Sequence, residues 1–301
     1  MLWEFAGENN AGKSRLAMQL ALTVQLPHTL GGVSGATCYV TTREELHTPV
    51  IEQILENNPL LSPDLCGLPD IDTVKAPFFP AFQKVLTESL PAIADARART
   101  PGAKPVKLVV VDTFSDIFDK DKDQRYEDTV QRARDLRKVS LLMHQLADKY
   151  RLAVVMLGST RRTFPRVDGE DRAPGELRYS DQERWFARAV SLPGEDANEA
   201  ILGHVWPNQL NARIMMSRTI RTRPRSVVAP RPKDEGKGKG RADAGPPPKR
   251  RKLEDGAGAG VEDDPSVPLR RFSVIFSSAA PPASCDFVIL DEGIVGIPVE
   301  E

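Results

Sequence analysis

Near its start the 301-residue chain carries Gly7-Glu8-Asn9-Asn10-Ala11-Gly12-Lys13-Ser14, and its predicted architecture follows from this segment. The spacing GxxxxGKS is typical of a phosphate-binding loop, whose backbone N–H groups surround the phosphates of a nucleotide. In such a loop the Lys13 ammonium neutralises the phosphates and the Ser14 hydroxyl ligates magnesium. Gly7 and Gly12 permit a close backbone approach that a Cβ would obstruct. We therefore expect the loop from Gly7 to Ser14 to bind a nucleotide.

The residues on both sides of this loop have the patterns that such a site requires. Residues 2–6 alternate as a β-strand does, and Leu16, Leu20 and Val24 recur at the spacing of an amphipathic helix. A second buried strand is predicted at residues 36–41. Helices are predicted at residues 49–57 and 82–98. The alternation of strands and helices predicts an α/β fold with a mostly parallel central sheet flanked by helices.

Asp112 ends the most apolar of the predicted strands. Residues 107–112 read Lys-Leu-Val-Val-Val-Asp, a β-branched run typical of a central parallel strand whose last side chain lies at the carboxyl edge of the sheet. At that edge the Asp112 carboxylate is expected to hold magnesium through water. The predicted strand at residues 152–157 is followed by Gly158, Ser159 and Thr160, which place small polar groups where a nucleotide sensor could lie.

The composition favours a folded protein without membrane segments. With 40% apolar residues the chain can bury one large core, and its apolar runs are much shorter than a bilayer requires. Cys38, Cys66 and Cys285 form no CxxC motif and pair with no histidine, so we expect buried small hydrophobes rather than disulfides or a zinc site. The net charge of −1 conceals a basic segment, because residues 221–252 hold twelve lysines and arginines against three acidic residues.

The second half of the chain is less regular. Residues 161–198 are polar and predict a mobile loop. Strands at residues 205–220 and 269–276 are expected to pair as a hairpin, and a final hairpin is expected at residues 287–297.

Three regions follow from these patterns: a core at residues 1–220, a disordered basic insert at 221–268, and strands at 269–301 that complete the core. The insert contains a dense basic cluster after three prolines, which resembles a nuclear import signal. Its residues are Lys249, Arg250, Arg251 and Lys252. A merely solubilising or nucleic-acid-binding tail is the alternative interpretation.

Taken together, these elements resemble the ATPase core of the RecA/RadA recombinases, a P-loop NTPase fold with C-terminal antiparallel hairpins. Within this superfamily the chain looks like the eukaryotic recombinase paralogues that assist homologous recombination. The suggested subgroup is the fungal counterpart of the vertebrate X-ray-repair cross-complementing paralogue, similar also to the yeast radiation-sensitivity mediator. The resemblance is carried by residues 5–27 with Gly31-Gly32, by residues 205–213, and by residues 281–285 with 291–296.

This resemblance implies a nuclear protein that binds ATP and magnesium and associates with single-stranded DNA, with another recombinase paralogue and with the recombinase filament. It would assist filament assembly in double-strand-break repair. The ATP loop would comprise Gly7, Glu8, Asn9, Asn10, Ala11, Gly12, Lys13 and Ser14, with Ser14 and Asp112 on the magnesium side. Stretches near 117–135 and 160–198 would face DNA. There Arg125, Arg132, Arg161 and Arg162 are candidate phosphate contacts, because arginine pairs bidentately with phosphate oxygens, although solvated surface arginines are the alternative.

Two departures from the family pattern bear on ATP hydrolysis. Active relatives use a glutamate shortly after the second strand to polarise the attacking water, whereas Arg43 occupies the corresponding position and cannot accept a proton. Glu44 is a substitute base only if the turn is shifted by one residue. The family's γ-phosphate-sensing glutamine is replaced by Ser159 or Thr160. We therefore expect ATP binding with weak or absent hydrolysis.

The start of the chain also departs from the family, because relatives carry a small DNA-binding domain and a linker before the core. Here Met1 lies within or beside the first strand, which indicates a shortened gene model or a reduced protein. The edge of the first strand is then expected to be exposed. Two other functions stay open, namely an active DNA-dependent ATPase with strand-exchange activity and an unrelated P-loop NTPase or kinase.

Overall fold

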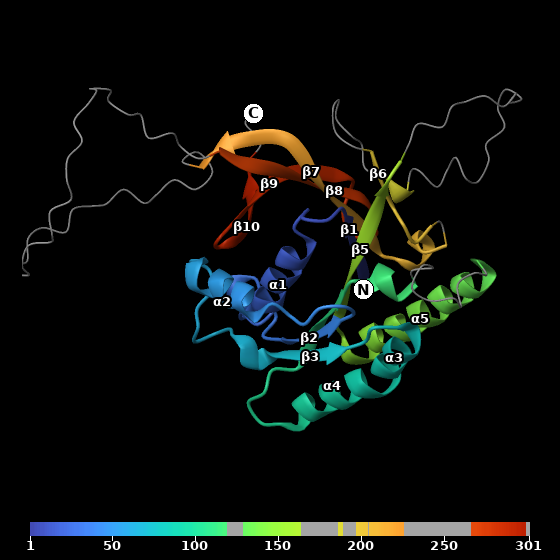
Figure 1. The fold of residues 1–301 in the computed structure, drawn as a ribbon. Coiled ribbons are helices and arrows are strands. Elements are labelled where there is room, and N and C mark those ends of the chain that lie inside the picture. The colour runs from blue at the N-terminus through green and yellow to red at the C-terminus, as the bar shows by residue number, and fades with distance from the viewer. Residues whose placement is uncertain (119–128, 164–185, 189–196, 204, 226–265, 299–301) are drawn as a thin grey trace, which may run out of the picture.

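A computed structural model describes residues 1–118, 129–163, 186–188, 197–203, 205–225 and 266–298 (Figure 1). The strands are β1 (Leu2–Gly7), β2 (Ala36–Thr41), β3 (Ile71–Lys75), β4 (Val106–Asp112), β5 (Ala153–Arg162), β6 (Asn198–Ala200), β7 (Ala212–Pro224), β8 (Ser266–Ser277), β9 (Ala283–Leu290) and β10 (Gly293–Ile297). The helices are α1 (Lys13–Thr23), α2 (Thr48–Asn57), α3 (Phe79–Lys84), α4 (Leu90–Arg99) and α5 (Thr129–Tyr150).

The strands form one sheet in the order β10-β9-β8-β7-β1-β5-β4-β2-β3, and β6 pairs with the end of β5. The strands from β7 to β3 in this order pair in parallel, whereas β8, β9 and β10 join through antiparallel pairs. The predicted α/β fold, with a mostly parallel sheet and antiparallel C-terminal strands, is therefore confirmed.

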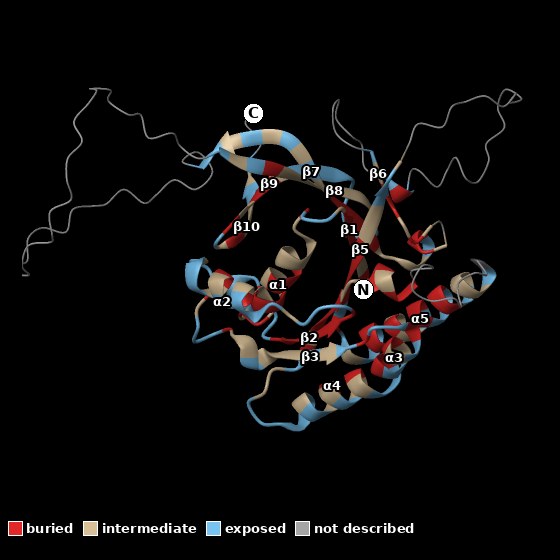
Figure 2. Ribbon diagram, in the orientation of Figure 1, coloured by how far each residue is buried: buried red, intermediate tan, exposed pale blue. Residues whose placement is uncertain are grey.

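Helices cover both faces of the sheet because apolar side chains occupy both faces of its central strands. In β4, Leu108 and Val110 pack in the cluster that contains α1 and α2, whereas Val109 and Val111 pack in the cluster that contains α3, α4 and α5. Figure 1 shows these helix groups on opposite sides of the strands, and Figure 2 shows buried residues gathered on β1 and β2 and along α5. A strand that is apolar on both faces is typical of a parallel sheet between helices. No helix in the described ranges is long and apolar enough to cross a membrane.

The strand that leads into the phosphate loop lies inside the sheet. β1 pairs with β5 on one side and with β7 on the other, so the expectation of an exposed edge was wrong. The register aligns Gly7 with Ser159 of β5, and Thr41 of β2 with Asp112 of β4. The carboxyl ends of β1, β2, β4 and β5 therefore meet at one edge, as the sequence predicted.

Two expectations for the chain after residue 157 need correction. The predicted strand at 205–220 begins only at Ala212, because Pro207 starts a 3₁₀ turn and Trp206 is buried against Phe114, with ring centroids 4.6 Å apart. The strand predicted to end at residue 157 continues to Arg162 and pairs with β6. The first part of the predicted 161–198 loop is therefore a strand.

Three further differences concern local structure. The helical region predicted at 82–98 runs from Phe79 to Arg99 and includes a π-helical turn at Val85–Ser89. The edge strand β3 was not predicted. Cys38 and Cys66 are buried as expected, but Cys285 is exposed on β9. Strands β7 and β8 also extend into the predicted insert, whose residues 226–265 lie outside the described ranges.

Candidate nucleotide-binding site

The carboxyl ends of β1, β2, β4 and β5 border a cleft of about 1320 Å³. Its lining brings together Asp112, Ser159, Thr160 and every residue of the predicted phosphate loop except Ala11, which is fully buried. Pockets for small molecules usually have volumes of about 300–1,000 Å³, so this cleft has room for a nucleoside triphosphate. The structure thus places residues from four separate strands around one space large enough for the expected ligand.

The backbone of the phosphate loop is tightly curled. Asn10 and Gly12 adopt left-handed conformations, with φ angles of 62° and 102°, and Gly12 precedes the first turn of α1. A Cβ on Gly7 would overlap the backbone oxygen of Met216 in β7. The Lys13 Nζ donates hydrogen bonds to the backbone oxygens of Gly7 and Glu8 at 2.7 and 2.8 Å. The Lys13 side chain therefore folds back onto the loop and closes it through these two hydrogen bonds.

The electrostatic surroundings of Lys13 suit a ligand that is both anionic and metal-bound. Burial lowers the pKa of Lys13, and the nearby carboxylates Asp112, Glu8 and Asp116 oppose this shift. A magnesium-bound triphosphate satisfies both signs of charge, because the lysine faces the phosphates and a carboxylate faces the cation.

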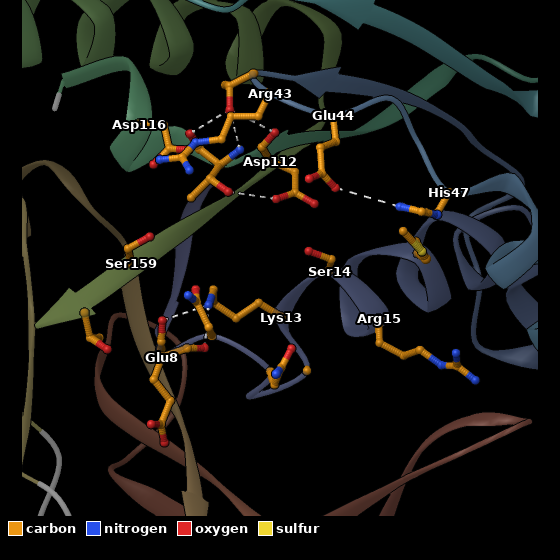
Figure 3. Close-up of a pocket in the computed structure, with 18 of the residues that line it drawn as sticks. Glu8, Lys13, Ser14, Arg15, Arg43, Glu44, His47, Asp112, Asp116 and Ser159 are labelled. Carbon is orange, nitrogen blue, oxygen red and sulfur yellow. Dashed lines mark hydrogen bonds and ion pairs between the residues drawn. The ribbon is translucent and has the colours of Figure 1, made fainter. Parts of the chain in front are cut away.

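Asp112 is held in place by two hydroxyl groups. The Tyr39 hydroxyl donates to Oδ2 at 2.9 Å, and the Thr113 hydroxyl donates to Oδ1 at 3.0 Å. Burial raises the pKa of Tyr39 well above its usual range, and Asp112 raises it further, so this phenol remains a donor. In Figure 3 the Ser14 hydroxyl points toward the Asp112 carboxylate. Within the described residues no group of three or more His, Cys, Asp or Glu could hold a metal, so magnesium there would also need phosphate oxygens.

The side chains of Arg43 and Glu44, at the rim of this cleft, point toward different partners. The Arg43 Nε forms an ion pair with Oδ2 of Asp116, and the Arg43 side chain is 58% exposed against 9% for Asp116. The Glu44 side chain is 84% exposed, and its Oε2 lies 3.8 Å from Nε2 of His47. Figure 3 shows the Glu44 carboxylate directed to His47 and away from Lys13. This placement gives no support to Glu44 as a base, which stays a prediction.

The predicted DNA-binding arginines fall in different environments. Arg161 and Arg162 are exposed at the end of β5, and Arg162 lines the cleft. Arg132 on α5 donates from Nη2 to the backbone oxygen of Ile201 at 3.3 Å, which ties the helix to the chain after β6. Arg125 lies outside the described residues, as does the cluster of Lys249, Arg250, Arg251 and Lys252.

Three arginines that the sequence did not indicate, Arg15, Arg218 and Arg270, also line the cleft, and the last two lie side by side. Arg218 of β7 and Arg270 of β8 are direct partners in the antiparallel ladder. Arg218 lies with its Nε 3.4 Å from Oε2 of Glu8, and Arg270 donates from Nε to the backbone oxygen of Asn10 at 3.1 Å. Burial lowers the pKa of Arg270, and the charge of Arg218 adds to this effect. No local signal could have found them, because the basic insert separates them in sequence.

The residues present fit ATP and magnesium. Gly7 allows the close packing of the loop, Lys13 would face the phosphates, and Ser14 and Asp112 would offer oxygen ligands to magnesium. The hydroxyl of Thr160 is buried at the cleft, and within the described residues it has no hydrogen-bond partner. A buried hydroxyl without a partner is costly, and a phosphate oxygen would satisfy it.

Comparisons with known proteins agree with this geometry. A family model described as Rad51 matches residues 1–173. The chain is 24% identical over 299 residues to the DNA repair protein XRCC3 homolog of Arabidopsis thaliana, an alignment that covers 98% of this chain and 86% of the plant protein. It is 24% identical over 233 residues to the DNA repair protein rhp57 of Schizosaccharomyces pombe, covering 71% and 62% respectively. It is 29% identical over 154 residues to the DNA repair protein RAD57 of Saccharomyces cerevisiae, covering 51% and 32%.

Proposed function

The chain belongs to the Rad51 family, and from this premise we propose that it binds ATP with magnesium and acts in DNA repair by homologous recombination. Its role is to assist recombinase filament assembly on single-stranded DNA, together with another recombinase paralogue, in the nucleus. The names of the plant and yeast relatives support the repair function. The cleft supports the nucleotide function, because it combines a phosphate loop with the Asp112 carboxylate.

The pairing of Arg43 with Asp116 is the observation that carries the mechanistic part of this proposal. A general base must lie within about 2.6–3.2 Å of the proton that it accepts, or one water away. Arg43 cannot serve, and Glu44 faces His47. Loss of a positioned base costs about 10²- to 10⁴-fold in rate, while phosphate binding does not depend on that base. ATP therefore acts as a ligand that the protein holds and cleaves slowly.

Four side chains of the cleft, together with the loop backbone, then have binding roles. Lys13 and the loop N–H groups hold the phosphates, Ser14 and Asp112 lie on the magnesium side, and Thr160 supplies a hydroxyl to the terminal phosphate. When bound, ATP would supply the negative charge that pairs with the Lys13 ammonium and the loop N–H groups.

DNA contact is assigned to the exposed end of β5. Arg162 lines the nucleotide cleft, and the exposed Arg161 precedes it in β5, so a DNA phosphate held by Arg162 would lie near the nucleotide. Arginine contacts to phosphates give affinity without sequence preference, which suits a protein that binds any broken end.

The proposal is tested by filament assembly of a Rad51-type recombinase on fluorescent single-stranded DNA, with and without the purified protein and Mg-ATP. We expect assembly to increase with the wild-type protein, and to lose this increase in Lys13→Ala but not in Lys138→Ala, an exposed lysine of α5. We expect the Arg161→Ala/Arg162→Ala variant to bind DNA more weakly and with a shallower salt dependence. An assembly rate that the wild-type protein leaves unchanged would overturn the proposal.

A further inference from the structure

The backbone at Arg43 is fixed although the side chain is exposed. The Thr42 N–H donates to the backbone oxygen of Asp112 at 2.9 Å, and the Thr113 N–H donates to the Thr42 hydroxyl at 3.0 Å. These bonds tie the chain before Arg43 to the end of β4. The Arg43 side chain as a whole is 58% exposed, and the residue lines the cleft, so the side chain has room to change partners without any movement of the sheet.

Its partner Asp116 is fixed much more firmly. Asp116 belongs to a short 3₁₀ helix (Phe114–Phe118) whose two phenylalanines are fully buried and in contact with each other. The hydroxyl of Ser115 accepts a hydrogen bond from the backbone N–H of Ser159 at 3.0 Å, which joins this helix to β5. Asp116 is therefore part of a rigid wall of the cleft.

The carboxylates on this wall of the cleft repel the negatively charged ligand that the site is expected to bind. Asp116 lies close enough to Lys13 to favour its protonated form, as Asp112 and Glu8 also do. A triphosphate adds further negative charge beside these carboxylates. In Figure 3, Arg43 lies across the cleft from Lys13, on the same wall as Asp116 and Asp112. A terminal phosphate at this place would be stabilised by a second cation besides Lys13, and Arg43 is near enough to the cleft to provide it.

We propose that Arg43 binds the terminal phosphate of ATP by exchanging its ion pair with Asp116 for that phosphate, and so makes the site selective for ATP over ADP. This inference rests on the proposed ATP binding. Arg43 cannot act as a base, but it can bind the nucleotide, because its planar guanidinium can pair bidentately with phosphate oxygens. Asp116 holds Arg43 when the terminal phosphate is absent, and competes for it when the phosphate is present.

This exchange predicts effects of opposite sign for the two partners. Arg43→Ala removes a charge-assisted contact to the terminal phosphate, so Mg-ATP should bind about 10- to 100-fold more weakly while Mg-ADP changes by less than about threefold. Asp116→Asn removes the competitor and a repelling carboxylate, so Mg-ATP should bind about two- to tenfold more tightly. If the ion pair were only structural, both changes would break it and would act in the same direction.

The experiment is isothermal titration of the full chain with Mg-ATP and Mg-ADP, with circular dichroism to check folding. Arg43→Lys keeps the charge but not the fork geometry and should keep part of the preference, and Arg99→Ala, an exposed arginine at the end of α4, should keep all of it. A wild-type protein that binds neither nucleotide would refute the proposed function itself. Unchanged ATP-to-ADP selectivity in Arg43→Ala, or weaker ATP binding in Asp116→Asn, would refute this inference alone.

Discussion

Replacing Lys13 with alanine should remove most of the stabilisation that ATP gives to the folded protein. The Lys13 ammonium already donates two short hydrogen bonds to the loop carbonyls, so it is positioned over the place where phosphates would lie. Hydrogen bonds to charged groups contribute about 1.5–3 kcal/mol each. Loss of one such contact weakens binding about 10- to 150-fold, because about 1.4 kcal/mol corresponds to a factor of ten.

Urea denaturation in the presence of Mg-ATP measures this loss. At a nucleotide concentration of about 100 times the wild-type Kd, binding should raise the free energy of unfolding by about 2.7 kcal/mol. A variant that binds 100-fold more weakly should gain only about 0.4 kcal/mol at the same concentration. Without nucleotide the two proteins should differ little, because burial of the ammonium opposes the attraction of Asp112 and Glu8.

Two controls make the result decisive. Lys138→Ala removes an exposed lysine from α5 and should keep the full ATP-dependent increase. Lys13→Arg keeps a positive charge but not the fit of the ammonium between the loop carbonyls, and should give an intermediate increase. An ATP-dependent increase in Lys13→Ala as large as that of the wild-type protein would show that the nucleotide binds elsewhere.

Two sets of substitutions and one chemical modification test the packing of the fold. In Gly7→Ala the new Cβ would overlap a backbone oxygen of β7, so the free energy of unfolding should fall by about 1–3 kcal/mol in urea denaturation; no loss would contradict the packing of the loop. Arg213→Met leaves the buried carboxylate of Glu4, whose Oε2 lies 2.6 Å from Nε of Arg213, without its cation. This variant should lose about 3–5 kcal/mol, and Glu4→Leu/Arg213→Met should recover most of that loss; equal losses would exclude the buried pair as the cause. In the native protein at about pH 8 a thiol reagent should modify Cys285 but not Cys38, because burial raises the pKa of the Cys38 thiol to about 12. Mass spectrometry reads this out, and modification of Cys38 in the folded state would contradict its burial.

The phosphate loop could be predicted from sequence because its chemistry is local. Phosphate binding requires particular residue types at a fixed spacing, and all of them lie within eight consecutive residues. They are Gly7, Gly12, Lys13 and Ser14. The strand that ends in Asp112 was equally clear, because a strand buried on both faces needs a continuous apolar run. The same argument does not extend to β3, an edge strand that is only partly buried and whose sequence Ile-Asp-Thr-Val-Lys has neither a continuous apolar run nor a regular alternation.

The rest of the site depends on contacts between distant parts of the chain. Arg218 and Arg270 meet only because β7 and β8 pair, and sequence patterns do not fix the register across a long insert. Asp116 lies in a short 3₁₀ helix, for which no periodic signal exists. The apolar residues around Trp206 resembled the start of a strand, but they serve a turn packed on Phe114.

The central claim, that this chain holds ATP and cleaves it slowly, is tested most directly by phosphate release from γ-labelled ATP at saturating Mg-ATP and single-stranded DNA. A Rad51-type recombinase that retains the catalytic glutamate serves as the reference. We predict that nucleotide is bound while phosphate release is about 10²- to 10⁴-fold slower than for the reference. Release at the rate of the reference, abolished by Lys13→Ala, would contradict the claim.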